Sequence, residues 1–396
     1  MLTPKYLMDV AEPVRQLFSG IEQQMACDIA ERIVKAGSYI GKVDYNVFKG
    51  KQFGKLTREL RSMLRKGQAI SKQQIQRLMT ESVTESVKTD DAIFRAAGIE
   101  PIPVADSPAQ QAIILQGTQS TAQLMENYTH TMATSSYQAF TSSLDQAYLS
   151  VVTGSSDYVS AIRHAVNELA SNGVSSFSYA SGAHTSVEAG VRRAILTGIN
   201  QTVAKLALAR CDEFGTDLVE TTSHAGARPT HEVWQGMVFS ISGRNPHYGD
   251  FYADTGYGEG DGLCGWNCYH SFYPYFDGLS TQAFEHDPSA AAGRDNDEDY
   301  ELQQKQRYYE RMIREAKRRC EVINAAREEA NDPALVEGLT KDFEDASVVL
   351  KRREAKLRNF LNEHGRTRLR DRESIGNWNR SISGRAVWAN RKASGR

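Results

Sequence analysis

The stretch from Thr216 to Ile241 reads TDLVETTSHAGARPTHEVWQGMVFSI. It contains two short apolar and β-branched runs, Leu218–Thr222 and Met237–Ile241, which are typical of strands. Glycine, proline, histidine and tryptophan lie between them, and a texture rich in Gly, aromatic, His and Cys residues continues to residue 280. These features predict a small α/β module over residues 216–285.

The chain before this module has a helical pattern. Apolar residues from Val14 to Ile33 recur at intervals of three and four, and Gly37 can end that helix. Residues 38–55 contain three glycines, so we expect a loop there. Ser71 and Gln74 form a capping-box pattern, which predicts that the next helix begins at this point.

Three further helices are expected before the module. Asp157 or a neighbouring serine can open one of them, which runs through Ile162 and Val166 to about Ala170. Ser107 followed by Pro108 is a typical cap and first-turn pair, and a helix can continue from there to Val152. Thr185 with Glu188 forms a second capping-box pattern, which opens a helix that closes near Gly215.

After the module the helical pattern returns. Residues 286–300 are acidic and are expected to be a linker. The next apolar positions have the spacing of a heptad seam and are Tyr309, Ile313, Ala316, Cys320 and Ile323. Asn331-Asp332-Pro333 interrupts the pattern, and a second helix of similar length follows. Residues 301–365 are therefore predicted to form an antiparallel helical hairpin.

Length and composition agree with this division. The chain has 396 residues, of which 40% are hydrophobic and 24% charged, as in soluble globular proteins of two or three domains. Neither a signal-peptide pattern nor an apolar run of membrane-spanning length is present, which favours a chain made and kept in a cytoplasm. Its five cysteines do not make an extracellular disulfide framework.

The fold class predicted from these patterns is mainly α with a small α/β (α+β) central module, a helical N-terminal half and a C-terminal helical hairpin. The expected division of the chain is a helical domain (1–215), the central module (216–285), the acidic linker (286–300), the helical hairpin (301–365) and a basic tail (366–396).

The net charge of −2 hides a strong asymmetry. Residues 351–396 contain 14 basic and 4 acidic residues, whereas residues 1–300 have a net charge of −10. The tail lacks a core pattern, which is typical of a segment that orders only on a partner. Its candidate contacts with DNA or a partner protein are Arg366, Arg368, Arg370, Arg372, Arg391 and Lys392. The alternative is a solvated helix face followed by a disordered end.

The central module contains residues of the types that bind zinc, namely His224, His231, Cys264, Cys268 and His270. Four such groups converging tetrahedrally could hold an ion and stabilise a module with a thin core. However, the spacing matches no standard zinc finger. The alternative is that these side chains form hydrogen bonds with backbone carbonyls and that the protein has no cofactor.

Catalytic interpretations of the module lack the spacing that they require. His231-Glu232 begins like the zinc helix of a metalloprotease, but Gln235 stands where the second histidine ligand would be. Cys268 with His224 or His231 as its base is chemically allowed, yet any Cys and His in one module permit that pairing. The sequence therefore favours a protein that is not an enzyme.

Two motifs in the module carry a family resemblance. The first is Arg228-Pro229-Thr230-His231 leading to Trp234 and Gly236, and it resembles a motif of the Mu F-like phage head-morphogenesis class. The second, Asn267-Cys268-Tyr269-His270, is similar to the downstream ending of that class. With the helical N-terminal half, this layout most resembles the phage minor capsid protein 2 family. The sequence departs from the class at Tyr269, where Arg is usual, and at His270, where Cys is commoner.

The resemblance implies a structural protein of the virion, made in the host cytoplasm and present in few copies. Its partners would be the portal protein and other capsid components, and its role would lie in head assembly or in DNA packaging and ejection. The motif residues would hold the module's loops together, with protein docking as a second role. A homo-oligomer and contact of the basic tail with packaged DNA are compatible with this role, whereas a membrane partner is not expected.

Two other classes of protein remain as alternatives. The first is a hydrolase or toxin-like effector that carries a head-targeting module, which would need an additional constellation of catalytic residues outside residues 216–280. The second is a DNA-binding protein unrelated to phages, which would carry basic residues throughout the fold. The acidic balance of residues 1–300 opposes the second alternative.

Overall fold

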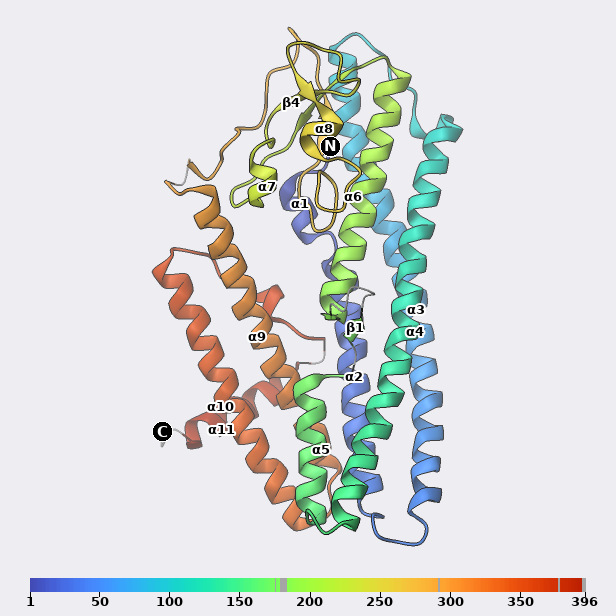
Figure 1. Ribbon diagram of the computed structural model, residues 1–396, viewed down its shortest axis with the longest axis vertical. Helices are drawn as coiled ribbons and strands as arrows, with labels where there is room; N and C mark the ends of the chain where they lie inside the picture. The colour runs from blue at the N-terminus through green and yellow to red at the C-terminus, as the bar shows by residue number, and fades with distance from the viewer. Residues whose placement is uncertain (175, 179–183, 291–292, 377, 394–396) are drawn as a thin grey trace. The chain divides into compact units, whose positions relative to one another are not determined.

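The computed structural model describes residues 1–174, 176–178, 184–290, 293–376 and 378–393 (Figure 1). Its contacts divide the chain into two compact units, which are interleaved along the sequence. The sheet unit consists of Met1–Arg15, Ile70–Glu126 and Ala189–Gln304, and the hairpin unit consists of Gln16–Ala69, Asn127–Glu188 and Lys305–Arg396. The division predicted from sequence follows the order of the chain, whereas these two units are defined by contacts in space.

Most of the described chain is helical, as the sequence predicted. The helices up to residue 213 are α1 (Pro4–Asp9), α2 (Glu12–Gly37), α3 (Tyr45–Ala96), α4 (Pro108–Val152), α5 (Tyr158–Asn172) and α6 (Val187–Glu213), with a short 3₁₀ helix η1 (Val104–Asp106). Ser107 Oγ accepts a hydrogen bond from the backbone N–H of Gln110 at 3.4 Å, which caps α4 where the sequence predicted a cap. Within the described residues, no helix combines the length and apolar character needed to cross a bilayer.

The prediction of a loop over residues 38–55 is wrong for most of its length, because α3 already begins at Tyr45. The predicted helix start at Ser71 is wrong too, since Ser71 is buried in the middle of α3. An apolar stripe through the buried residues Leu56, Leu60 and Leu64 carries the helix onward. The stabilisation from burying this stripe exceeds the cost of helical glycines, which is about 1 kcal/mol each.

The sheet unit contains a four-stranded sheet in the order β5-β4-β3-β6. Its strands are β3 (Leu218–Thr221), β4 (Val238–Ser240), β5 (Gly249–Asp250) and β6 (Phe272–Pro274), joined by the short helices α7 (Pro229–Glu232) and α8 (Phe251–Thr255). β3 is antiparallel to both β4 and β6. This confirms the two predicted strands and the mainly α fold with a small α/β module.

The sheet packs against α6, beside which it lies in Figure 1. One buried apolar cluster joins Ala207 and Cys211 of α6 to Val219, Phe239 and Phe272 of the strands. Since three strands and two helices, α6 and α8, contribute to this cluster, it holds the loops that leave the ends of the strands.

The predicted helical hairpin is formed by α9 (Asn296–Glu329) and α10 (Pro333–Glu363). Asp332 caps α10 by accepting hydrogen bonds from the backbone N–H groups of Ala334 and Leu335. The rings of Tyr309 and Phe360 pack with their centroids 5.4 Å apart across the hairpin. The hairpin unit also contains a two-stranded antiparallel sheet of β1 (Ser176–Ser178) and β2 (His184–Ser186).

The basic tail is more ordered than its sequence indicated. It contains a short 3₁₀ helix, η3 (Arg370–Glu373), and α11 (Arg380–Ala393), which lies along α10 (Figure 1). Ile382, Ala386 and Ala389 are buried on one side of α11. The expectation of a tail without a core is therefore wrong for α11. Its apolar side is built mainly from small residues, which give only a weak periodic signal.

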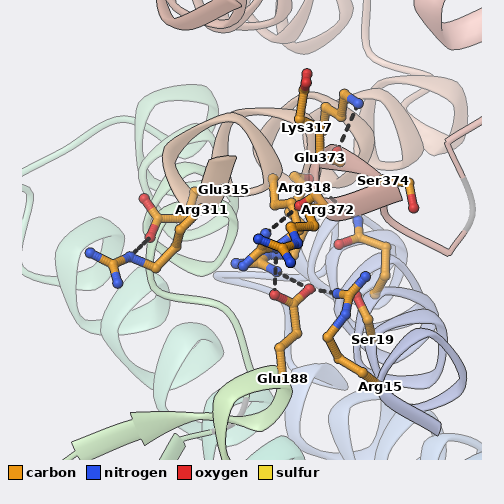
Figure 2. Close-up of polar contacts among 12 residues, drawn as sticks. Arg15, Ser19, Glu188, Arg311, Glu315, Lys317, Arg318, Arg372, Glu373 and Ser374 are labelled. Carbon is orange, nitrogen blue, oxygen red and sulfur yellow. Dashed lines mark hydrogen bonds and ion pairs between the residues drawn. The ribbon is translucent and has the colours of Figure 1, made fainter. Parts of the chain in front are cut away.

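Glu188 at the beginning of α6 is a buried anchor of the hairpin unit. Its carboxylate accepts hydrogen bonds from Ser19 Oγ at 2.7 Å, from Arg314 Nε at 2.7 Å and from Arg318 Nη1 at 2.9 Å. Figure 2 shows Ser19 and Arg318 converging on this carboxylate. The buried negative charge is thus matched by two guanidinium groups, as a buried carboxylate requires.

Candidate functional site

The sheet topology brings the two sequence motifs together. The first motif leaves the end of β3, and the second enters β6, which pairs with β3 so that Phe272 lies opposite Thr221. The ladder continues one residue further, because the backbone N–H of Thr222 donates to the carbonyl oxygen of Ser271 at 2.9 Å. Residues just after β3 and just before β6 are therefore neighbours, although they are almost 50 positions apart in sequence.

The first motif forms a tight turn of helix. Arg228 precedes α7, and Pro229 occupies its first turn, where proline is well tolerated. This turn places His231 on the buried side, beside the buried Trp234. Gly236 has a φ of +64°, and a Cβ there would lie 2.6 Å from the carbonyl oxygen of Glu285. Only glycine fits this position, which explains its place in the motif.

The second motif lies in a loop held in an unusual backbone conformation. Cys264 and Asn267 have φ angles of +60° and +55°, in the left-handed region. The side-chain amide of Asn200 on α6 donates to the carbonyl oxygens of Cys268 at 3.3 Å and His270 at 2.9 Å. These two hydrogen bonds attach the loop that contains Cys268 and His270 to the helix.

Three of the predicted residues converge on one point, and their side chains are at most 2% exposed: His231, Cys268 and His270. The Nδ1 atoms of His231 and His270 lie 3.4 Å apart. Cys268 Sγ lies 3.8 Å from Nδ1 of His231 and 3.6 Å from Nδ1 of His270. We refer to these three residues as the His-Cys-His triad.

The outward-facing nitrogens of both histidines have fixed partners. Nε2 of His231 donates to the backbone carbonyl oxygen of Asp261 at 2.7 Å. Nε2 of His270 lies 3.0 Å from Gln235 Oε1, which also accepts the backbone N–H of His224 at 3.1 Å. An atom that accepts the His224 N–H is an oxygen, so Nε2 of His270 must carry the proton.

Burial disfavours the charged forms of the three triad side chains. It lowers the pKa of His231 to about 4 and that of His270 well below its ordinary value, because both rings are removed from water. Burial likewise raises the pKa of the Cys268 thiol to about 11. A nucleophilic cysteine needs the opposite, an accessible thiol with a lowered pKa. The environment of Cys268 therefore disfavours the cysteine-nucleophile interpretation.

The other two predicted zinc ligands lie close to the triad but do not belong to it. His224 stacks on His270 with the ring centroids 4.5 Å apart, and its Nδ1 lies 3.1 Å from the carbonyl oxygen of Ala225. Cys264 donates to the carbonyl oxygen of His270, with Sγ 3.7 Å away, and packs in the apolar cluster between sheet and helix. The five candidates are thus reduced to three.

The remaining motif positions connect the two loops. Arg228 Nη2 donates to the carbonyl oxygen of Trp266 at 3.0 Å and so joins the first motif to the second. Asn267 supplies the left-handed residue directly before Cys268. Tyr269, which stands where arginine is usual, accepts a hydrogen bond from Arg192 Nη2 at 2.5 Å.

Several of the six basic residues predicted as contacts have partners within the described part of the chain. Arg366 donates to Gln306 Oε1 at 2.9 Å, Arg368 makes a bidentate pair with Glu373, and Lys392 pairs with Glu344 at 2.7 Å. Arg372 is half-buried, and its carbonyl oxygen accepts a hydrogen bond from Arg314. Arg370 and Arg391 are exposed and are the members best placed to meet a partner.

Two residues of the site were missed by sequence reasoning. In the sequence, Gln235 stands only where a metalloprotease would have its second histidine, yet its side chain orients His270. Asn200 holds the second motif from α6. Its signal was an amide directly after Ile199 in the apolar pattern of α6, and a buried amide usually has a structural partner.

The family model described as phage minor capsid protein 2 matches residues 2–362. The chain therefore belongs to the phage minor capsid protein 2 family.

Two curated relatives are both called structural proteins. That of Lactococcus phage LL-H is 29% identical over 238 residues, which cover 58% of this chain and 60% of the relative. That of Lactococcus phage mv4 is 36% identical over 137 residues, which cover 34% of this chain and 96% of the relative. The chain thus spans less than two thirds of the length of the first relative. No solved structure matches it.

Proposed function

We propose that this protein is a portal-associated minor component of the phage head, which acts in head assembly and in DNA packaging or ejection. The observation that carries the proposal is the family match over almost the whole chain, together with relatives that are phage structural proteins. The portal enters as the partner because the module's two motifs resemble those of the Mu F-like head-morphogenesis class.

The construction of the module suits a docking element better than a catalyst. Its motif residues are used on internal contacts: Arg228 joins the two loops, Gly236 permits a close approach, and Asn267 sets the backbone before Cys268. Such contacts hold a surface in one shape. The buried thiol of Cys268 argues against the alternative of a hydrolase that uses this module.

The proposal is tested by co-expressing the full chain with the tagged portal protein of the same phage genome. We expect the two proteins to co-purify in a fixed ratio. The complex should survive about 0.5 M salt, which screens surface charge, because a specific docking interface does not depend on surface charge alone. The major capsid protein of the same genome, carrying the same tag, serves as the control bait. Equal recovery with both baits, or recovery with neither, would contradict portal association.

A further inference from the structure

We propose that the His-Cys-His triad is a zinc site, in which His231 and His270 bind the ion through Nδ1 and Cys268 binds it through Sγ. The inference does not rest on portal association and concerns the module alone. Its ligands come from α7 and from the loop before β6, so the ion would connect two segments 37 residues apart in sequence (231 to 268).

The distances between the three atoms match the edges of a zinc tetrahedron. With Zn–N of about 2.0–2.1 Å and Zn–S of about 2.3 Å, a tetrahedral angle separates two nitrogens by about 3.3–3.4 Å, and nitrogen from sulfur by about 3.5–3.6 Å. The observed separations are 3.4 Å between the nitrogens, and 3.6 and 3.8 Å from the nitrogens to sulfur. These separations would let one ion contact all three atoms.

The hydrogen bonds around the triad leave lone pairs pointing inward. Because Nε2 of each histidine is the protonated nitrogen, both Nδ1 atoms are acceptors that face each other. The Cys268 S–H can donate to only one of them. Without a cation, one buried lone pair therefore faces another, an arrangement that costs free energy. A bound zinc ion satisfies both nitrogens at once.

The surroundings also resemble those of established metal ligands. Histidine ligands usually donate their second ring nitrogen to a carbonyl or carboxylate oxygen, as His231 does to Asp261 and His270 does to Gln235. The backbone N–H of His270 donates to Cys268 Sγ at 3.4 Å, which stabilises a thiolate. Two imidazoles and a thiolate favour zinc over magnesium or calcium. The triad leaves the fourth position of the ion to a ligand outside these three residues.

The test uses the full-length protein and two cysteine variants. After exposure to zinc and removal of loosely bound metal, we expect one zinc per chain in the wild type and in Cys264→Ser. Cys268→Ser should lose the ion. Cys264 is the matched control, because it is equally buried and only four positions away but does not belong to the triad. With cobalt in place of zinc, the wild type and Cys264→Ser should show a sulfur-to-cobalt charge-transfer band.

X-ray absorption at the zinc edge of the wild-type protein provides a test that does not depend on any variant folding. It should show one sulfur at about 2.3 Å and nitrogen neighbours at about 2.0 Å. A folded wild-type protein that holds no zinc would overturn the proposal. So would zinc without a sulfur neighbour, or loss of the ion from both cysteine variants alike. Portal co-purification is measured separately, so failure of one proposal leaves the other standing.

Discussion

At the scale of single residues, the backbone of the turn before Cys268 is strained. Two non-glycine residues, Cys264 and Asn267, have left-handed backbone conformations within four positions. Asparagine tolerates this region better than other side chains, whereas a residue such as alanine is penalised there. We therefore expect few other residues to be tolerated at these two positions of the turn.

We expect Asn267→Ala to destabilise the module by about 1 kcal/mol, and Asn267→Gly to be close to neutral, because glycine enters the left-handed region freely. Chemical denaturation of the two variants and the wild type measures the difference. If alanine and glycine had the same effect, backbone conformation would not be what Asn267 contributes.

Glu321 on α9 is a buried carboxyl whose pKa is raised to about 7 by removal from water. Its Oε2 has no hydrogen-bond partner within the described part of the chain. Since the folded pKa lies above the unfolded value of about 4.3, the folded state binds the proton more tightly. Stability should therefore be highest at low pH for this group and fall as the pH rises from about 4 to 7.

Glu321→Gln removes this ionisation. We expect the variant to be more stable than the wild type by about 1–3 kcal/mol at pH 8, with a much smaller difference near pH 5. Denaturation curves at the two pH values give the result. Glu363→Gln, whose side chain is 74% exposed, is the control and should show no such pH-dependent gain. A gain of equal size at both pH values would exclude ionisation as its cause.

At the scale of elements, local signals predicted those helices whose ends carry caps or breakers. Pro108 and Val152 bound α4 as predicted, and Asp332-Pro333 opens α10. The prediction of a loop over residues 38–55 is wrong from Tyr45 onward because it treats Gly50 and Gly54 as helix breakers. Both positions have open space where a Cβ would lie, so these glycines weaken the helix without interrupting it.

The site was predictable in its residue types but not in its geometry. Two short apolar and β-branched runs indicated β3 and β4, and the chemistry of the module indicated five candidate ligands. Which three of the five meet depends on β6 pairing beside β3, a long-range contact that no local pattern encodes. For the same reason Asn200, on a helix far away in sequence, could not be connected to the motif loops in advance.

Replacing two helical glycines by alanine should change the stability of the protein in opposite directions. Gly198 on α6 faces Thr121 on α4, and a Cβ there would lie 2.2 Å from Thr121 Oγ1, whereas Gly50 on α3 meets nothing within 4 Å. We expect Gly198→Ala to destabilise the protein by about 1–3 kcal/mol through overpacking. Gly50→Ala should stabilise it by about 0.5–1 kcal/mol through helix propensity.

Thermal denaturation of the two alanine variants distinguishes these effects directly. A rise in melting temperature for both variants would mean that α4 and α6 separate easily enough to admit a methyl group. A fall for both would mean that Gly50 has a role that the described contacts do not reveal.

At the scale of the whole molecule, the tail has a positive net charge and residues 1–300 have a negative one. Some of the basic side chains of the tail are already paired with carboxylates of the same chain. Arg368 and Lys392 are engaged in ion pairs, while Arg370 and Arg391 are exposed. If packaged DNA is a partner of the tail, these exposed arginines supply the contact, and salt should weaken it as counterions return to the phosphates.

We expect Arg370→Gln/Arg391→Gln to elute from immobilised DNA at lower salt than the wild type, with the log–log salt dependence reduced by about 1–2 units. Arg61→Gln/Arg65→Gln on α3 changes the net charge by the same amount at exposed positions and should leave elution almost unchanged. An equal shift for both pairs would assign retention to overall charge and not to the tail.

The interleaving of the two units has a consequence for how the chain is made. The sheet unit needs residues up to Gln304, and the hairpin unit needs the last part of the chain, although both begin within the first 16 residues. As the ribosome releases the chain from its N-terminus, early helices must wait for partners that are synthesised hundreds of residues later. Neither unit can complete its fold during most of translation. The emerging chain must therefore avoid aggregation until its later segments have been synthesised.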